Sequence, residues 1–182
     1  RATGFPKNRV VGQSGILDSS RYRSFIAKEL NVSVNSVAAM VLGGHGDDMV
    51  PVRSTCLVGG VPIEKLIPAK RLDEIEARVR NAGGEVVALL KTGSAYFSPA
   101  SAAIRMTEAH FFDKKEILPC AALLEGEYGV NGYYFCVPVI IGAGGVEKII
   151  DINLNAADKK AFDESLNHVK DIVQAMDRIL GA

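Results

Sequence analysis

Residues 137–147 read Val-Pro-Val-Ile-Ile-Gly-Ala-Gly-Gly-Val-Glu, an apolar run that ends in closely spaced glycines. Such a run can open a dinucleotide-binding unit, in which the pattern G-x-G-x-x-G holds a phosphate at the start of a helix. Here Glu147 stands where the last glycine of that pattern would stand, and residues 150–154 alternate apolar and polar side chains as a strand does. The chain ends at residue 182, too soon for the rest of a nucleotide-binding domain. We therefore predict a hairpin turn here and no Rossmann fingerprint in this chain.

The strands around this turn indicate the fold class. The sequence predicts three of them in succession, at residues 116–124, 133–141 and 147–154. Their connections are short and rich in Gly, Asn and Glu, so an antiparallel meander is the simplest topology. Upstream, residues 37–42 predict a short buried strand that ends at Gly43-Gly44. Residues 55–63 predict two strands joined by a tight turn at Gly59-Gly60.

Helical segments are indicated by apolar side chains at steps of three and four residues. They are residues 18–31, about 70–92, 98–112 and a long segment after Asn155. We expect Asp18, Ser98 and Asn155 to act as N-caps, because short polar side chains accept hydrogen bonds from the free amides of a first helical turn. Gly83-Gly84, in the middle of the second segment, predicts a kink or a close backbone contact.

These elements predict an α+β fold, with mixed and antiparallel sheets packed against long helices in one domain, residues 1–182. The composition, 48% hydrophobic and 23% charged, is that of an ordinary globular protein with a real core. The sequence begins Arg1-Ala2-Thr3 without an initiator Met. We therefore expect a chain that starts inside a longer gene product.

Charge and cysteine content narrow the function classes. Lys and Arg total 21 and so do Asp and Glu, which gives no electrostatic case for binding nucleic acid or an anionic membrane. No apolar run approaches the roughly 20 residues of a membrane span, and no signal peptide is visible. Cys56, Cys120 and Cys136 match no zinc or redox spacing, so we expect buried thiols in a reducing cytoplasm and no metal site.

His45 is the histidine that the sequence singles out. It follows a predicted buried strand and has Gly44 and Gly46 on its two sides, so no neighbouring Cβ blocks a ligand from the imidazole. A histidine in a loop at a strand end suits proton transfer near neutral pH, although an ordinary turn histidine is an equal alternative. His110 and His168 lie inside predicted helices without a second ligand at helical spacing, which favours packed or solvated side chains.

Asp18 and Arg21 form a second candidate pair. They are three residues apart and share a face of the first helical turn. On spacing alone this favours a helix cap with a surface ion pair. The same geometry would also let a carboxylate orient an imidazole and a guanidinium grip a substrate carboxylate with two hydrogen bonds. Ser94, within Thr92-Gly93-Ser94-Ala95, is a weaker candidate, because small hydroxyl residues are common in turns.

With these residues the chain resembles the C-terminal domain of the malate/lactate dehydrogenase superfamily over essentially its whole length. The resemblance rests on five segments: Gly4-Phe5-Pro6, Leu17-Asp18-Ser19-Ser20-Arg21-Tyr22-Arg23, Gly43-Gly44-His45-Gly46-Asp47-Asp48-Met49-Val50-Pro51, Lys91-Thr92-Gly93-Ser94-Ala95 and Val137-Pro138-Val139-Ile140-Ile141-Gly142. The form of the third segment is similar to that of the lactate-dehydrogenase-like malate dehydrogenases of bacteria. Lactate dehydrogenases usually carry Glu where Gly44 stands.

The resemblance implies a role for each candidate. It implies that His45 is the proton shuttle in NAD-dependent oxidation of malate to oxaloacetate, with Asp18 as the carboxylate that orients the ring. Arg21 would clamp the C1 carboxylate of the substrate. Ser94 would line the substrate pocket, and Ser98 would lie where the nicotinamide approaches.

The resemblance also implies partners and leaves alternatives open. NAD would be held mainly by an N-terminal Rossmann domain that this chain does not show, and the family forms dimers and tetramers. An L-lactate dehydrogenase is the alternative enzyme, since malate against lactate is decided largely in that other domain. A non-enzymatic oligomerisation domain is the alternative of another class, because the apolar stripes along residues 72–90 and 162–180 permit self-association.

Overall fold

The computed structural model describes residues 4–181, so the opening residues Arg1 to Thr3 and the last residue of the predicted domain lie outside the described part. Its fold is the predicted one: long helices packed on curled antiparallel sheets. The helices are α1 (Gly15–Leu30), α2 (Ala69–Leu90), α3 (Phe97–Phe111) and α4 (Ala156–Leu180). The strands are β1 (Gly12–Gln13), β2 (Val37–Ala38), β3 (Val41–Gly43), β4 (Met49–Pro51), β5 (Leu57–Val58), β6 (Val61–Pro62), β7 (Glu116–Glu125), β8 (Asn131–Gly142) and β9 (Gly145–Ile149).

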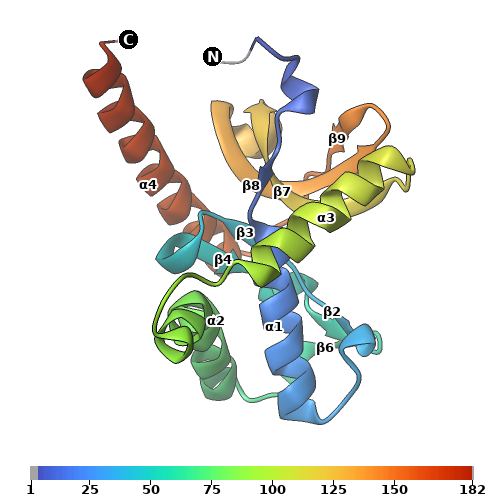
Figure 1. Ribbon diagram of the computed structural model, residues 1–182. Coiled ribbons are helices and arrows are strands. Elements are labelled where there is room, and N and C mark those ends of the chain that lie inside the picture. The colour runs from blue at the N-terminus through green and yellow to red at the C-terminus, as the bar shows by residue number, and fades with distance from the viewer. Residues whose placement is uncertain (1–3, 182) are drawn as a thin grey trace.

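The larger sheet has the strand order β1-β7-β8-β3-β4, with β9 also paired to β8. The meander β7-β8-β9 is antiparallel as predicted, and β8 and β9 are joined by the predicted hairpin, with Gly145 at a φ of +90°. The smaller sheet, β2-β5-β6, contains the predicted turn at Gly59-Gly60. In Figure 1 the long strands and α3 form the upper half of the molecule, α2 and the small sheet form the lower half, and α1 joins the two.

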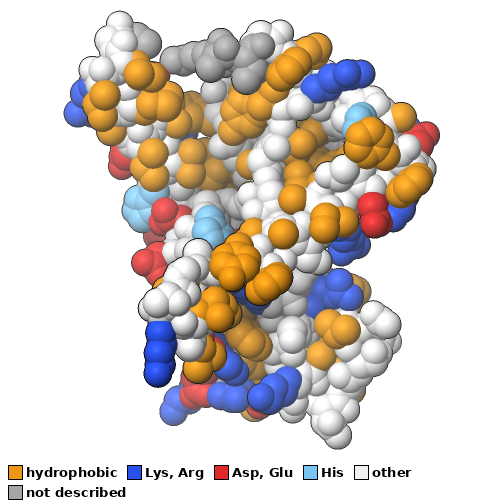
Figure 2. Space-filling view, viewed as in Figure 1, with side chains coloured by type: hydrophobic (Ala, Val, Ile, Leu, Met, Phe, Trp, Pro, Cys, Tyr) orange, Lys and Arg blue, Asp and Glu red, His pale blue; other side chains and the backbone are white. Residues whose placement is uncertain are grey.

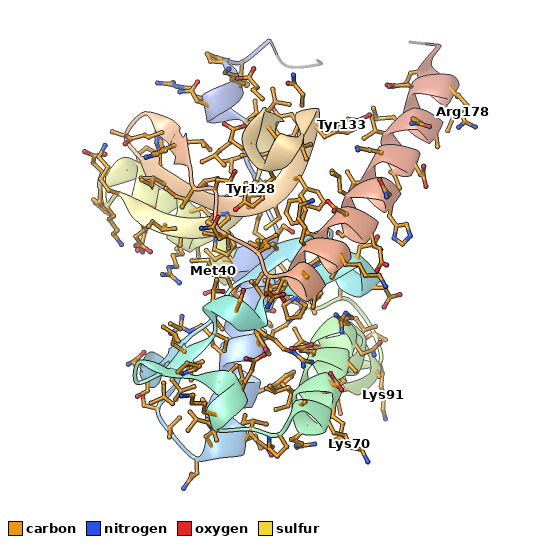
Figure 3. The ribbon with its side chains drawn as sticks, turned by 180° about the vertical axis from the view of Figure 1, so that it is seen from behind. Met40, Lys70, Lys91, Tyr128, Tyr133 and Arg178 are labelled. Carbon is orange, nitrogen blue, oxygen red and sulfur yellow. The ribbon has the colours of Figure 1, made fainter. Side chains whose placement is uncertain are left out.

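Several predicted boundaries were wrong. Residues 37–42 are not one strand, because the chain breaks at Ala39-Met40 and places β2 and β3 in different sheets. Met40 lies where the two halves of the molecule meet (Figure 3). The last strand of the meander, β9, ends at Ile149 and not near Leu154. The segment that contains Gly83-Gly84 stays helical throughout α2.

Two of the three predicted caps were wrong. Ser14 and not Asp18 precedes α1, and Tyr96 and not Ser98 precedes α3; neither residue makes a side-chain cap hydrogen bond. Asn155 does cap α4, since its side chain accepts a hydrogen bond from the backbone amide of Asp158. The polarity of a single residue locates a helix start only to within a turn, because neighbouring packing decides which residues become helical.

The hydrophobic core has two parts. The upper part includes Leu118, Val137 and Phe162 between the large sheet, α3 and α4, and the lower part includes Ile63, Leu72 and Val79 between α2 and the small sheet. Helix α1 contributes to both parts, through Ile16 and Leu17 above and through Tyr22, Ile26 and Ala27 below. The ring of Phe162 packs against Tyr128 and Phe135, with ring centroids 5.0 and 4.8 Å away.

Gly15 fixes how α1 meets the large sheet. A Cβ atom at this position would lie 2.2 Å from the carbonyl oxygen of Val41 and 2.6 Å from Sγ of Cys136. Only a residue without a side chain permits this close approach of a helix to β3 and β8. The contact places the first turn of α1, and with it Asp18, beside the loop that follows β3.

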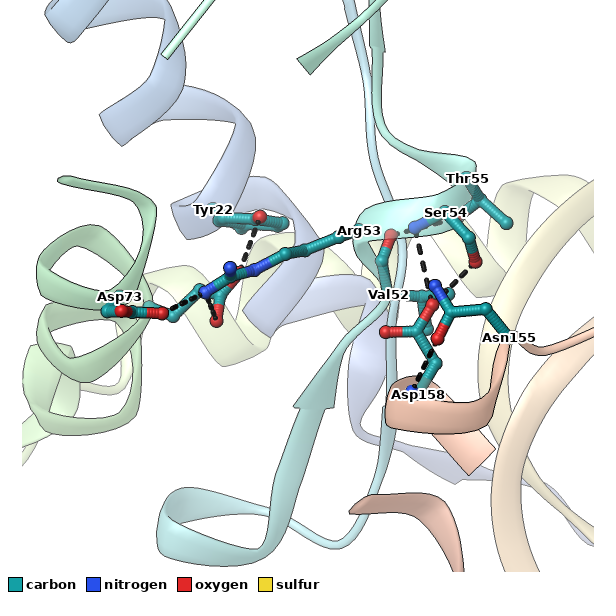
Figure 4. Close-up of polar contacts among 9 residues, drawn as sticks. Tyr22, Val52, Arg53, Ser54, Thr55, Asp73, Asn155 and Asp158 are labelled. Atoms are coloured by element: carbon teal, nitrogen blue, oxygen red, sulfur yellow. Dashed lines mark hydrogen bonds and ion pairs between the residues drawn. The ribbon is translucent and has the colours of Figure 1, made fainter. Parts of the chain in front are cut away.

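A cluster of polar side chains links α2, in the lower half, to the segment that follows β4. Arg53, just after β4, donates to Glu76 of α2 through Nε at 2.6 Å and through Nη2 at 2.9 Å, and it also pairs with Asp73 (Figure 4). Glu76 is buried and also accepts a hydrogen bond from the hydroxyl of Tyr22. Burial near this carboxylate raises the pKa of the Tyr22 hydroxyl, so it stays a neutral donor.

Candidate functional site

The candidate site is the loop of residues 44–48 between β3 and β4. The backbone leaves the sheet at Gly43 with a φ of +84°, a conformation that favours glycine. His45 follows with its side chain 57% exposed, so the imidazole can reach a ligand. In the space-filling view two histidine side chains and acidic atoms lie on one face, midway up the molecule (Figure 2).

Asp18 lies directly behind this loop. Its carboxylate is fully buried, and Oδ2 accepts a hydrogen bond from Nδ1 of His45 at 2.9 Å. This hydrogen bond raises the pKa of His45 above its ordinary value, since the carboxylate favours the imidazolium; partial burial of the ring and the positive charge of Arg21 act in the opposite direction. Nε2 has no partner among the described residues, so it is the ring atom that can exchange a proton with a ligand.

Arg21 follows Asp18 on the same face of α1. Its Nη1 lies 3.7 Å from Oδ1 of Asp18, beyond hydrogen-bond distance, and its side chain is 13% exposed. The guanidinium is therefore held close to the Asp18–His45 pair while its N–H donors stay available. It also packs beside α2, where a Cβ at Gly83 would lie 3.7 Å from Nη1. The close backbone contact predicted at Gly83-Gly84 is not found, because this is ordinary van der Waals distance and a Cβ at Gly84 would meet no described atom within 4 Å.

The structure corrects the view of Asp18 and Arg21 as a surface ion pair. A surface pair would expose both groups, whereas the carboxylate of Asp18 has no exposed area and its Oδ1 has no hydrogen-bond partner among the described residues. A buried carboxylate costs free energy unless neighbouring groups compensate it. Here His45 and Arg21 are those neighbours, which is an arrangement typical of a functional site.

Ser94 and Ser98 lie before α3 and in its first turn. Ser94 is exposed in the connection between α2 and α3, where its carbonyl oxygen accepts a hydrogen bond from the amide of Tyr96. Ser98 is half-buried in the first turn of α3 and lines a cavity of about 540 Å³ that Arg21 also lines. His45 is not among the residues that line this cavity, so the structure relates Ser98 to Arg21 rather than to the imidazole.

Sequence reasoning missed the contacts that α4 makes with the loop. The buried Ser165 accepts a hydrogen bond from the amide of Gly44 at 2.9 Å and donates one to the carbonyl oxygen of Asp48 at 2.6 Å. His168, predicted to be merely packed or solvated, bonds through Nδ1 to Oδ1 of Asp48 at 2.5 Å. The available signal was weak: Ser165 is a polar residue next to Leu166, on the side of the helix that the apolar stripe buries.

The remaining reactive side chains are held in structural contacts. Nδ1 of His110 bonds to the carbonyl oxygen of Gly142 at 2.8 Å. The three cysteines are free and buried as predicted, and burial raises the thiol pKa of Cys56 and of Cys136 to about 12. Among residues 4–181 we find no group of three or more His, Cys, Asp or Glu side chains that could hold a metal ion. In the same part of the chain, no helix combines the length and apolar character needed to cross a membrane.

The arrangement allows proton transfer and the binding of an anion. An exposed imidazole with a free Nε2 can exchange a proton with a ligand, and the nearby guanidinium can hold a carboxylate. The glycine-rich residues 142–145 form a hairpin turn between β8 and β9 and not the helix start that binds a pyrophosphate. The described residues therefore offer no motif for the phosphates of a dinucleotide.

Comparisons with known proteins point to one family. Residues 16–178 match the family described as lactate/malate dehydrogenase, alpha/beta C-terminal domain. The chain is 52% identical over 180 residues to malate dehydrogenase from Rhodopirellula baltica, which covers 99% of this chain and 57% of that protein. It is 51% identical over 175 residues to malate dehydrogenase from Geobacillus kaustophilus, covering 96% of this chain and 56% of the relative. The chain thus spans a little over half the length of these relatives.

Solved structures agree with this match. The fold superposes on malate dehydrogenase from Salinibacter ruber with a TM-score of 0.95 and 48% identity, covering 99% of this chain and 59% of that one. It superposes on lactate dehydrogenase from Cryptosporidium parvum, solved with lactic acid and NAD, with a TM-score of 0.93 and 47% identity, covering 96% and 57%. Similarity of this kind extends to both malate and lactate dehydrogenases.

Proposed function

Because the chain belongs to the lactate/malate dehydrogenase family, we propose that it is the substrate-binding part of a malate dehydrogenase, with His45 as the proton shuttle. The observation that carries this proposal is the 2.9 Å contact between Nδ1 of His45 and the buried Asp18, which leaves Nε2 free. The reaction would be the reversible NAD-dependent oxidation of malate to oxaloacetate. The family match supports an NAD-dependent oxidoreductase, and the roles of single residues are our proposal from the resemblance and from this contact.

In this proposal each of the three side chains has a separate role. The chemistry that NAD would supply when bound is that of a hydride acceptor for C2 of malate. Neutral His45 takes the hydroxyl proton of malate on Nε2, and Asp18 stabilises the imidazolium that forms and keeps Nδ1 as the donor. Arg21 binds the C1 carboxylate through two parallel hydrogen bonds, which orients C2 toward the cofactor. In the reverse direction the protonated His45 returns its proton to the carbonyl oxygen of oxaloacetate.

Gly44 supports malate over lactate as the substrate. A Cβ at this position would lie 2.7 Å from Cβ of Asp48, so the loop in its present shape has no room for the Glu that lactate dehydrogenases usually carry there. The two relatives compared by sequence above are also both named malate dehydrogenase. A lactate dehydrogenase is the second candidate, because the Cryptosporidium parvum enzyme named above shares the fold at 47% identity.

The rest of the proposal concerns partners. We propose that a Rossmann domain binds the dinucleotide, since the described residues offer no phosphate motif and the relatives are longer than this chain. Ser94 and Ser98 would then meet the substrate and the nicotinamide only once that domain is in place. A cytoplasmic location and assembly into dimers or tetramers complete the proposal.

His45→Asn tests the proposal in the complete enzyme, by which we mean this chain joined to the N-terminal part that its relatives possess. We expect hydride transfer from NADH to oxaloacetate to be abolished while NADH binding, followed by nucleotide fluorescence, stays close to wild type. The wild-type enzyme should reduce oxaloacetate faster than pyruvate. Near-normal turnover by His45→Asn would overturn the catalytic assignment, and a preference for pyruvate would replace malate by lactate.

A further inference from the structure

Helix α4 holds the His45 loop at both of its ends. The hydroxyl of Ser165 accepts a hydrogen bond from the amide of Gly44, the residue before His45, and donates one to the carbonyl oxygen of Asp48, where the loop returns to β4. One side chain from a distant part of the sequence thus forms hydrogen bonds to both ends of the loop. We propose that Ser165 is a positioning residue, which fixes this loop so that Nδ1 of His45 stays on Asp18. The inference rests on the proposed role of His45.

The surroundings of Ser165 support a specific role. Its side chain is buried on the face of α4 that packs onto the hairpin β3-β4, and both of its partners are backbone atoms of the loop. A Cβ at Gly43 would lie 2.7 Å from its Oγ, so the hydroxyl fits closely against the backbone there. Without the hydroxyl, the amide of Gly44 and the carbonyl oxygen of Asp48 would both lose a partner in a partly buried place, and the loop would move to find others.

His168 makes a different kind of contact. It lies one turn further along α4 and bonds only to the side chain of Asp48, and it is itself 63% exposed. An exposed contact of this kind contributes little to position, because solvent competes for both groups. Ser165 is therefore the residue of α4 that we expect to determine the backbone of the loop.

A matched control exists at the other end of the hairpin. Ser54, after β4, donates through its hydroxyl to Asp158 at the start of α4, at 2.6 Å, and its amide donates to the same oxygen (Figure 4). Ser54→Ala removes a serine hydroxyl that also joins α4 to this hairpin, but it does not touch residues 44–48. A general loosening of α4 would follow from either substitution, whereas loss of loop geometry should follow only from Ser165→Ala.

The first readout is the imidazole of His45 in this chain, without cofactor or turnover. We would titrate the three histidines by NMR, assign His45 by the signal that His45→Asn removes, and check the fold by circular dichroism. In Ser165→Ala we expect the pKa of His45 to fall toward the ordinary value of about 6.5, because the ring leaves the carboxylate that favours its charged form. The charged groups in and around the loop are Asp47 and Asp48 within it, Asp18 and Arg21 from α1, and His168 from α4. They are the same in the variant and in Ser54→Ala.

The second readout is turnover of oxaloacetate by the complete enzyme. A displacement of about 1 Å at a reacting group can cost about 100-fold in rate, so we expect Ser165→Ala to lower kcat by about 10- to 100-fold with KM little changed. Ser54→Ala should stay within about twofold of wild type. Ser165→Cys keeps the size of the side chain with weaker hydrogen bonds and should give intermediate values, which covers the case that alanine disturbs folding.

An unchanged pKa of His45 in a folded Ser165→Ala chain would overturn this inference, and so would an equal change in Ser54→Ala. These outcomes differ from a failure of the proposed function, which would appear as normal turnover by His45→Asn. If His45→Asn is inactive and Ser165→Ala is unchanged in both readouts, only the role of Ser165 is wrong.

Discussion

The substitution Arg21→Lys tests whether Arg21 binds the substrate carboxylate or only places a positive charge near Asp18. In the structure the guanidinium is 13% exposed and lies 3.7 Å from Oδ1 of Asp18, too far for a hydrogen bond, so its donors remain available to a substrate carboxylate. Lysine keeps the positive charge but offers one ammonium group in place of a planar fork. The substitution therefore removes the two-pronged hydrogen bonding of the guanidinium and keeps the positive charge.

The size of the effect follows from the hydrogen bonds that are lost. A hydrogen bond to a charged group contributes about 1.5–3 kcal/mol, and the fork makes two of them where the ammonium makes one well-placed contact. Allowing for imperfect placement of the ammonium, we expect a loss of about 2–4 kcal/mol of transition-state stabilisation. At about 1.36 kcal/mol for each factor of ten, this is a fall of roughly 30- to 900-fold in kcat/KM.

The assay is steady-state reduction of oxaloacetate by the complete enzyme, followed by the absorbance of NADH. Arg71→Lys is the matched control, because Arg71 makes a two-pronged contact with Glu29 on the surface, at 2.9 and 2.7 Å, away from the loop. This control should leave kcat/KM within about twofold of wild type, as expected for an exposed ion pair. If Arg21→Lys stays within threefold of wild type, Arg21 does not bind the substrate carboxylate and the proposed clamp is refuted.

Three further predictions concern the same enzyme. Reduction of oxaloacetate needs the protonated form of His45, so the rate should fall as the pH rises through the raised pKa of His45. The substitution Asp18→Asn should move that fall to lower pH and slow reduction near neutrality. An unchanged midpoint in a single-turnover pH profile would count against the pairing of Asp18 with His45. This chain alone should bind NAD negligibly, because most of the affinity for a dinucleotide comes from phosphate and adenosine contacts, and a micromolar Kd by calorimetry would contradict this. The chain should also self-associate through apolar side chains exposed on α2 and α4, such as Leu89 and Ile179, and sedimentation of a monomer at high concentration would argue against such a surface.

The sequence predicted the elements with strong periodicity and missed those that depend on packing between distant segments. The meander of β7, β8 and β9 and the helices α2 and α4 followed from hydrophobic patterns that extend over many residues. The break between β2 and β3 could not be predicted, because residues 37–42 are uniformly apolar and only the two sheets decide where the chain changes partner. The cap at Asp18 failed for a similar reason, since Gly15 and its close contact with β3 begin α1 earlier.

The candidate site was predicted in part. His45 was found from the glycines around it, and the structure brings it to Asp18, a contact that spacing alone could not establish because the two residues lie on different elements. The roles of Ser94 and Ser98 stay predictions, and the structure adds only that Ser98 and Arg21 line the same cavity. The contact of Ser165 with the loop could not be predicted, because a lone serine within an apolar helical stripe carries no motif. Its role depends on which backbone atoms the fold places against it.

Helix α1 contributes side chains to both parts of the core, and this has a consequence for how the domain opens. Neither half can lose its packing without exposing one side of α1. We therefore expect opening of the upper half and of the lower half to be coupled through this helix. Amide hydrogens along α1 should therefore exchange with solvent only when the whole domain unfolds, and they should be among the slowest in the chain. Since Asp18 lies on that helix, we expect the carboxylate behind His45 to keep its place as long as the domain stays folded.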